Sequence, residues 1–428
     1  MKLKVVGGKP LKGYVDISVC KNAILPLFVS CLVLDGGSVS FFISSIEDIK
    51  SLVFVMKYIG VIINIDNNNV TVSVDYNNIS INNDLLLDML EVQKLRMSIY
   101  LLGPLLALFN GSVKMLLPGG DQIGERPINF HIDILKSMGA SIEIENGFII
   151  GKASILKPIE YIFPKVSTGA TYHALITAVF VNGKSIFHNC AIEPEVIFIY
   201  NTLKTFGVDI RKYGTTFVVY GNGKGIKNNK NYFINIIPDR IEAFTYLCLG
   251  LITNGDITIK CDDIGYLCGK GISLLSKIGA MITFQDSFVN IKRSKDIGNI
   301  SFVESEEFPG FPTDCGPLLV TLLGLGKGTS VFKENIFHRF QYIKELDKLG
   351  IDVKENNNYE VTIDGIKEYV SNNSIVKSTD IRGGMSLLMA ALSIKGTTII
   401  DDIYHISRGY DDYINKLIKL GANLSIID

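Results

Sequence analysis

Residues 317–332 read PLLVTLLGLGKGTSVF, and this stretch decides how the chain folds. A helix over its first half has almost no polar face, so it must be buried. The glycines that follow end the helix, and TSVF is rich in the β-branched and aromatic residues that strands favour. The stretch therefore predicts a buried helix that turns directly into a short strand.

The same pattern occurs six times along the chain. The other five copies are NAILPLFVSCLVLDGGSVSF at 22–41, MSIYLLGPLLALFNGSVKML at 97–116, TYHALITAVFVNGKSIF at 171–187, AFTYLCLGLITNGDITI at 243–259 and SLLMAALSIKGTTII at 386–400. After each copy a second, amphipathic helix closes on a glycine before another strand, at Gly60, Gly139, Gly207, Gly279, Gly350 and Gly421. These glycines are 79, 68, 72, 71 and 71 residues apart, so the repeating unit is helix, strand, helix, strand.

The length of the chain groups these repeats into domains. With 428 residues and 47% hydrophobic composition, the chain can build two full cores. A solenoid would allow any number of repeats, but three repeats make a domain of typical size. The sequence therefore predicts an α/β protein of two domains, each built from three helix-strand-helix-strand repeats.

Charge and cysteine content exclude several classes of function. With 42 basic and 43 acidic residues, no overall field attracts nucleic acid or an anionic membrane. The seven cysteines show neither CxxC nor zinc spacing, which indicates free thiols in a reducing cytoplasm. The longest apolar run, 99–109, is about half a membrane span, and the N-terminus has no apolar leader, so we expect a soluble protein.

Nucleotide and metal motifs are also absent from the sequence. The five histidines have no metal-ligand spacing, and neither GxxxxGK[ST] nor GxGxxG occurs. We therefore expect no metal, and neither nucleotide hydrolysis nor hydride transfer.

The stretch LLPGGDQIGERPINFH at 116–131 concentrates charged residues in a loop. Two glycines follow an apolar run, and Asp121, Glu125 and Arg126 come before Pro127. Glycines permit close backbone approach, and proline biases the residue before it toward an extended geometry. The loop could present a carboxyl and a guanidinium to one ligand, or it could be an ordinary glycine-rich connection.

Polar clusters stand in front of the six buried helices. They are Lys21-Asn22, Gln93–Arg96, Lys165–Thr171, Pro238–Glu242, Phe308–Asp314 and Ser378–Gly384. Residues such as Thr313 and Asp380 are expected to cap helix N-termini. Capping does not explain Lys21 or Arg96, because a cation at the positive end of a helix is unfavourable unless an anion shares the site. The clusters predict a site for a polyanionic small molecule, in which Asp314 is either a cap or a positioned base.

Arginine is scarce in this chain, with 8 arginines against 34 lysines. A planar guanidinium grips phosphate or carboxylate with two parallel hydrogen bonds, which lysine cannot do. Six of the eight lie in apolar or motif-like contexts, at 96, 126, 240, 339, 382 and 408.

Together these motifs resemble one family. The motifs are KNAILPL at 21–27, LRMSIYLLGPLLA at 95–107, LPGGDQIGERPINFHI at 117–132, KVSTGAT at 165–171, EPE at 193–195, PDRIE at 238–242, FPGFPTD at 308–314, TDIRGG at 379–384 and IYHISRGY at 403–410. In order and over the full length, they resemble the UDP-N-acetylglucosamine 1-carboxyvinyltransferases among the enolpyruvyl transferases.

The resemblance implies two inside-out α/β domains. One would comprise residues 1–20 with 237–428, and the other would be an insertion, 21–236, that carries the active-site loop 117–127. It also implies a cytoplasmic monomer that needs no cofactor and makes a peptidoglycan precursor, and so serves cell-wall biogenesis, cell shape and cell division.

The substrates implied by the resemblance are phosphoenolpyruvate and UDP-N-acetylglucosamine. Phosphoenolpyruvate would be held by Lys21, Asn22, Arg126 and Arg408. The UDP-sugar would be held by Arg96, Arg126, Pro127, Ile128, Asn129, Phe130, Lys165, Val166, Ser167, Thr168, Asp314 and Ile336. Arg339, Asp380 and Arg382 would line the cleft.

The catalytic residues implied are Lys21, Asp121 and Asp314. Asp314 would take the proton from the sugar 3-hydroxyl as that oxygen attacks C2 of the enolpyruvate, and the residue at 121 would protonate C3. The family usually has cysteine at 121, the target of fosfomycin, so Asp121 implies fosfomycin resistance. Tyr172-His173 also depart from the family pattern.

Two alternatives remain open on the sequence. The sister enzyme that acts on shikimate 3-phosphate shares the chemistry, although the 117–127 loop and the HISRGY motif argue against it. A degenerate homologue without catalysis is the other alternative. The evidence against it is that five motif residues are present: Lys21, Asp121, Arg126, Asp314 and Arg408.

Overall fold

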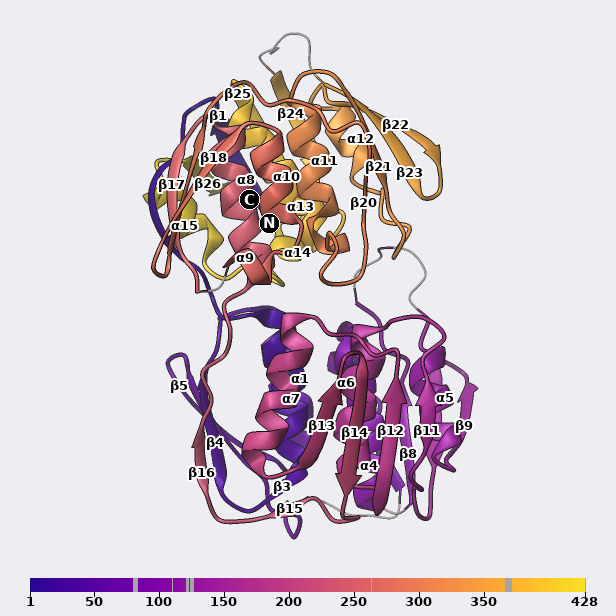
Figure 1. The fold of residues 1–428 in the computed structure, drawn as a ribbon. Coiled ribbons are helices and arrows are strands. Elements are labelled where there is room, and N and C mark those ends of the chain that lie inside the picture. Colours follow the sequence, from indigo (N-terminus) through magenta and orange to yellow (C-terminus); the bar gives the residue numbers. More distant parts are fainter. Residues whose placement is uncertain are drawn as a thin grey trace. The chain divides into compact units, whose positions relative to one another are not determined.

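The computed structural model describes residues 1–79, 84–109, 111–120, 123, 127–262, 264–365 and 372–427. Contacts divide the chain into two compact units (Figure 1). Of the described residues, the terminal unit comprises Met1–Ser18, Ile123 and those from Pro238 onward, and the inserted unit comprises Val19–Gly120 and Pro127–Ile237. The predicted domain boundaries, between residues 20 and 21 and between 236 and 237, lie within two residues of these segment ends and stay predictions.

Helices form where the sequence is apolar on all sides or amphipathic. In the inserted unit they are α1 (Lys21–Ser30), η1 (Cys31–Val33), α2 (Glu47–Tyr58), α3 (Leu90–Lys94), η2 (Arg96–Leu101), α4 (Leu102–Phe109), α5 (Asn129–Ser137), α6 (Thr168–Val179) and α7 (Pro194–Phe206). In the terminal unit they are α8 (Arg240–Ile252), α9 (Ile264–Leu267), α10 (Gly271–Lys277), η3 (Thr313–Cys315), α11 (Gly316–Gly324), α12 (Ile343–Asp347), α13 (Ile381–Ser393), α14 (Tyr404–Ser407) and α15 (Tyr413–Lys419).

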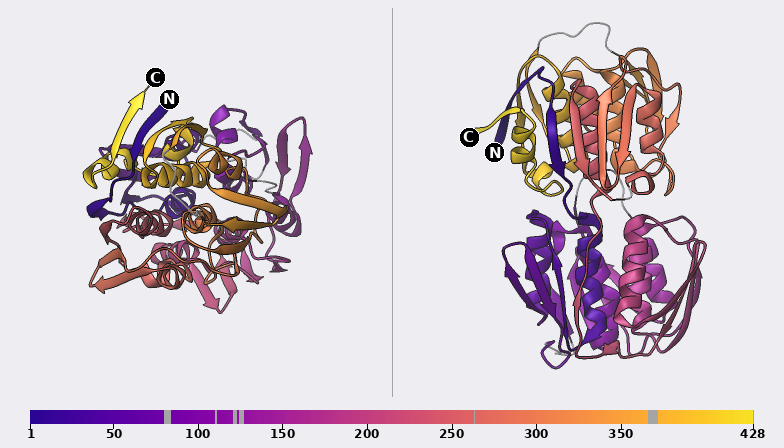
Figure 2. Two further views of the ribbon diagram at one scale, coloured as in Figure 1. Left: turned by 90° about the horizontal axis from the view of Figure 1, so that it is seen from above. Right: turned by 60° about the vertical axis from the view of Figure 1, so that its left-hand side comes forward.

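The helices predicted to lack a polar face are buried. All thirteen residues of α8 and twelve of the thirteen in α13 are buried, and α11 is buried along its whole length. Figures 1 and 2 show these helices at the centre of the terminal unit, with sheets around them, and the same arrangement recurs within the inserted unit. The predicted α/β class with three repeats in each unit is confirmed.

Each repeat has one four-stranded sheet. The terminal unit has β24 (Asn372–Lys377), β25 (Gly396–Asp401), β1 (Lys2–Gly7) and β26 (Asn423–Ile427); β2 (Lys12–Asp16), β17 (Asp256–Lys260), β19 (Phe288–Arg293) and β18 (Ala280–Gln285); and β20 (Val303–Glu304), β21 (Thr329–Lys333), β23 (Glu360–Asp364) and β22 (Asp352–Asn357). The inserted unit has β7 (Asp84–Leu87), β8 (Ser112–Leu116), β10 (Phe148–Lys152) and β9 (Ser141–Glu145); β11 (Glu160–Ile162), β12 (Gly183–His188), β14 (Thr216–Gly221) and β13 (Asp209–Tyr213); and β16 (Asn231–Phe233), β4 (Ser38–Phe42), β6 (Asn69–Ser73) and β5 (Ile62–Asp66), with a short pair β3 (Leu34–Asp35) and β15 (Ile226–Lys227).

All six sheets share one pattern of strand directions. In each, the first pair is parallel and the two following pairs are antiparallel. The repeat therefore contains two more strands than the sequence pattern indicated.

The glycines that close the second helices adopt the left-handed conformation, as predicted. Their φ angles lie between 76° at Gly350 and 114° at Gly279. Only glycine reaches this region without a Cβ penalty, so the six glycines fix the point where each helix turns into a strand. Across the described ranges, no helix has both the length and the apolar character needed to cross a bilayer.

The core of the inserted unit contains a pair of buried histidines. His173 Nε2 accepts a hydrogen bond from the backbone N–H of Gly103 at 3.0 Å, so the proton of neutral His173 is on Nδ1. That Nδ1 lies 3.2 Å from Nδ1 of His131, which therefore accepts. The pair links helices α4, α5 and α6 through hydrogen bonds that require both rings to be neutral.

We expect this pair to make the stability of the protein depend on pH. Burial lowers the pKa of His173 from 6.5 to about 3, so the unfolded chain takes up the proton first as the pH falls. The contribution of His173 is complete above pH 6.5 and decreases below it, by roughly 2 kcal/mol at pH 5. Urea unfolding at pH 7.5 and pH 5 measures the loss.

His173→Gln is the matched control, because the amide oxygen can still accept from Gly103 but does not titrate. Its unfolding free energy should fall less between the two pH values than that of the native protein. Equal pH dependence in both proteins would contradict a role for this ring.

Candidate active site

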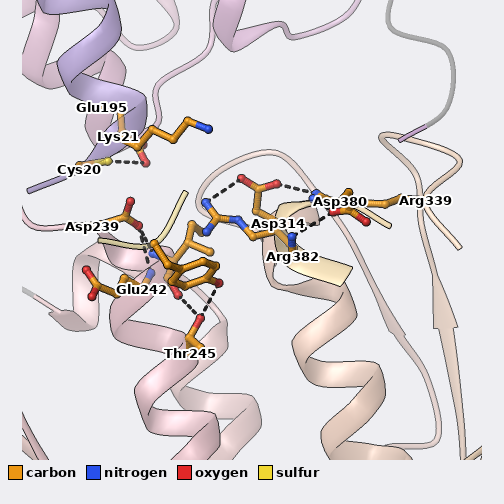
Figure 3. A network of polar contacts seen from close by, with 12 residues as sticks. Cys20, Lys21, Glu195, Asp239, Glu242, Thr245, Asp314, Arg339, Asp380 and Arg382 are labelled. Atoms are coloured by element: carbon orange, nitrogen blue, oxygen red, sulfur yellow. Dashed lines mark hydrogen bonds and ion pairs between the residues drawn. The ribbon is translucent and has the colours of Figure 1, made fainter. Parts of the chain in front are cut away.

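Asp314 of η3 lies between two arginines of the terminal unit (Figure 3). Its Oδ1 is 2.6 Å from Nη1 of Arg339, and its Oδ2 is 3.6 Å from Nη2 of Arg382. The Asp314 side chain is 27% exposed, whereas those of the two arginines are 2% and 3% exposed. Both oxygens of an accessible carboxylate are thus oriented by buried guanidinium groups.

Asp380 holds one of these arginines in place. Its Oδ1 accepts from Nη2 of Arg339 at 2.8 Å and from the backbone N–H groups of Arg382 and Gly383, so it caps α13 as predicted. Burial alone would lower the pKa of Arg339, but the carboxylates of Asp380 and Asp314 outweigh it and raise that pKa above its usual value. The guanidinium stays charged although it is buried.

Arg382 is supported from its other side by an aromatic ring. Its guanidinium lies 5.0 Å from the ring centroid of Tyr410, and the Tyr410 hydroxyl is 2.9 Å from Oγ1 of Thr245 in α8. Arg408, at the C-terminal end of α14, is also buried. Two buried arginines, Arg339 before α12 and Arg382 of α13, therefore flank the carboxylate of Asp314.

Lys21 is the first residue of α1 in the inserted unit. Its Nζ lies 2.8 Å from Oδ2 of Asp48, in the first turn of α2, and both side chains are buried. Asp48 therefore balances the cation that is unfavourable at this helix terminus. Beside it, the backbone carbonyl of Asn22 accepts from the Tyr172 hydroxyl at 3.4 Å.

Residues 127–130, which the resemblance implies in UDP-sugar binding, make two contacts with other parts of the inserted unit. Nη2 of Arg96 donates to the carbonyl oxygen of Pro127 at 2.9 Å, just before α5 begins. The rings of Phe130 and Phe163 pack edge to face, with their centroids 6.5 Å apart. Phe163 lies two residues before Lys165. The second contact thus links the start of α5 to the segment just before residues 165–168. Ser167 caps α6 by accepting from the Ala170 N–H at 3.3 Å.

Several sequence predictions need correction or completion. Thr313 was expected to cap a helix, but its hydroxyl donates to Oε2 of Glu334 at 2.8 Å, and the residue before η3 is Pro312. The sequence did not single out Asp48 or Glu334. Asp48 sits in an ordinary acidic first turn, and Glu334 follows a strand, so neither position has a local signal of function.

Two predicted site residues, Asp121 and Arg126, lie outside the described residues. Within the part of the chain that the structure does describe, no group of three or more histidine, cysteine or acidic side chains is placed to hold a metal ion.

The chain matches known proteins over its whole length. The family model for EPSP synthase (3-phosphoshikimate 1-carboxyvinyltransferase) matches residues 5–417. A UDP-N-acetylglucosamine 1-carboxyvinyltransferase from Rickettsia bellii is 35% identical over 426 residues, which is 99% of each chain. One from Campylobacter jejuni is also 35% identical, over all of this chain and 99% of the relative.

A solved structure shows the same fold. The enolpyruvyl transferase NikO from Streptomyces tendae superposes with a TM-score of 0.87 at 22% identity, over 99% of this chain and 98% of its own. The chain therefore belongs to the enolpyruvyl transferase family, and UDP-N-acetylglucosamine 1-carboxyvinyltransferases are its full-length relatives.

Proposed function

We propose that this protein transfers the enolpyruvyl group of phosphoenolpyruvate to the 3-hydroxyl of UDP-N-acetylglucosamine and releases phosphate. This reaction is the first committed step of peptidoglycan precursor synthesis. The observation that carries the proposal is the 35% identity to enzymes of that name over essentially both full lengths. The oriented carboxylate of Asp314 supports it, because the reaction needs a base at the sugar hydroxyl.

The chemistry is an addition followed by an elimination. Asp314 accepts the proton of the 3-hydroxyl while the oxygen bonds to C2, and Asp121 gives a proton to C3. The tetrahedral intermediate then loses phosphate from C2 and a proton from the C3 methyl group, which the Asp121 carboxylate takes back, and the double bond is restored. Arg339 and Asp380 orient Asp314, and Arg382 contacts its other oxygen, so the base is positioned before substrate arrives.

The residues that bind the substrates are assigned from the resemblance to the family. Lys21, Asn22, Arg126 and Arg408 hold phosphoenolpyruvate in this proposal. Arg96, Arg126, residues 127–130, residues 165–168, Asp314 and Ile336 hold the UDP-sugar. Helix N-termini at α1 and α6 add backbone N–H donors, which favour phosphate.

We also propose that the protein works as a cytoplasmic monomer. All seven cysteines carry free thiols and all are buried, which suits a reducing compartment.

The sister reaction on shikimate 3-phosphate is the second candidate, because the matching family model carries that name. Phosphate release from phosphoenolpyruvate should require UDP-N-acetylglucosamine. Release with shikimate 3-phosphate instead would replace the proposed substrate, and release with neither would favour a degenerate homologue.

Asp314→Asn should abolish turnover while the protein stays folded. The amide cannot accept the hydroxyl proton, so the rate should fall on the order of 10² or more. The matched control is Asp296→Asn, which alters an exposed ion pair with Lys327 and should leave turnover unchanged. Near-native turnover of Asp314→Asn, measured by phosphate release, would rule out the base assignment.

Lys21→Ala should also reduce turnover by on the order of 10² or more, because it removes a phosphate contact. The substitution leaves the buried Asp48 without its cation, which can destabilise the fold. The double variant Lys21→Ala with Asp48→Asn removes both charges and should be folded but inactive. A folded double variant with native turnover would exclude Lys21 from the reaction.

Asp121 should act as general acid and confer resistance to fosfomycin. An aspartate with a free pKa near 3.9 needs a rise of about 3 units, roughly 4 kcal/mol, to donate near pH 7. Bound phosphates and exclusion of water both favour the protonated carboxyl. A carboxylate is also a weaker nucleophile than a thiolate toward an epoxide.

Two variants test this assignment. Asp121→Cys should keep activity and gain time-dependent inactivation by fosfomycin, and Asp121→Asn should lose activity. A fosfomycin adduct on Asp121 of the native protein, seen by mass spectrometry, would disprove the resistance, and an active Asp121→Asn would disprove the acid role.

A further inference from the structure

Glu334 is a buried carboxylate to which the proposed mechanism gives no role. It follows β21 in the terminal unit and is 1% exposed. Its Oε1 accepts from the Ser305 hydroxyl at 2.6 Å and from the backbone N–H groups of Ile336 and Phe337 at 2.8 and 3.2 Å. Its Oε2 accepts from the Thr313 hydroxyl at 2.8 Å.

The hydrogen-bond pattern matches an ionised carboxylate. Two of the four partners are backbone N–H groups, which can only donate, and the hydroxyls complete the set. A carboxylate out of contact with water is costly unless such donors satisfy it. The four donors come from three separate segments, around 305, 313 and 336, so this one group fixes these segments relative to one another.

Two of those segments carry residues of the proposed reaction. Thr313 directly precedes Asp314, the proposed base, in η3. Ile336 is a proposed contact of the UDP-sugar, and its N–H is occupied by Glu334, which leaves its carbonyl oxygen and side chain for the sugar. The Glu334 carboxylate therefore links Thr313, the residue before the proposed base, to the backbone of Ile336.

We propose that Glu334, acting through the Thr313 hydroxyl, is a positioning residue that sets the Asp314 carboxylate against the sugar 3-hydroxyl. This inference rests on the proposed function. The buried arginines orient the carboxylate end of Asp314, and Glu334 fixes the backbone from which Asp314 extends. Loss of either constraint displaces the base relative to the bound sugar.

Thr313→Val and Thr313→Ser form the decisive pair. Valine keeps the shape of threonine but cannot donate to Oε2, whereas serine keeps the hydroxyl. Because a displacement of about 1 Å can cost 10²-fold in rate, Thr313→Val should lower kcat 10- to 100-fold. Its KM for UDP-N-acetylglucosamine should stay within about twofold, since the bonds to Oε1 remain, and Thr313→Ser should recover most of kcat.

Glu334→Gln adds a second measurement, the pH dependence of kcat. A residue that only stabilised the fold would not change this pH dependence. The amide oxygen can take the place of Oε1, and the Thr313 hydroxyl can turn to accept from the amide N–H, so the geometry is kept while one negative charge is lost. With that charge gone, Asp314 is more easily ionised, and the acidic limb of the kcat–pH profile should move to lower pH.

The outcomes separate this inference from the proposed function. Thermal melts establish that each variant is folded, and if Glu334→Gln does not fold, the threonine pair decides. If Asp314→Asn is inactive but Thr313→Val keeps native kcat, the positioning role is wrong and the base assignment survives. A Thr313→Val variant that lowers the melting temperature without changing kcat also overturns the positioning role. If Asp314→Asn is active, the base assignment itself fails.

Discussion

Helices with no polar face have to be covered on every side, and this requirement shapes both units. Sheets and neighbouring helices enclose α8, α11 and α13 in one unit and α1, α4 and α6 in the other, so only the helix ends can meet solvent or ligand. The polar clusters of the sequence stand at those ends. At an N-terminal end, unpaired backbone N–H groups also favour anions. Burial of the core therefore decides where chemistry can occur.

The charges gathered at these ends depend on partners from other repeats. An unpaired buried guanidinium or ammonium costs several kcal/mol. Arg339 of the fifth repeat pairs with Asp380 of the sixth, and Asp314 of the fifth contacts Arg382 of the sixth. Neighbouring repeats are thus held together by the same ion pairs that orient the base, so replacing one partner removes an ion-pair contact from a buried charge in the next repeat.

Much of the fold could be predicted because its signals are local. A helix without a polar face, a glycine at a helix end and an aspartate before a helix each have a cause within a few residues, and Gly279 and Asp380 behave as expected. Among the additional strands, β20 was missed because it has only two residues, and β2 because it pairs in parallel with β17 from a distant part of the chain. Asp48 and Glu334 were missed because their roles come from partners brought near by the fold.

Strand β1, near the start of the chain, pairs in one sheet with two strands near its end. It lies between β25 and β26, so Leu3 pairs with Ile400 on one side and Ile426 on the other. During translation at roughly 5–20 residues per second, β1 leaves the ribosome tens of seconds before either partner exists. The sheets of the inserted unit need only residues up to 233, so they can form on the nascent chain first. Until then the segment of β1 has no strand to pair with, and Leu3 and Val5, which are fully buried in the folded protein, stay exposed on the nascent chain. A chaperone can bind such an exposed apolar segment.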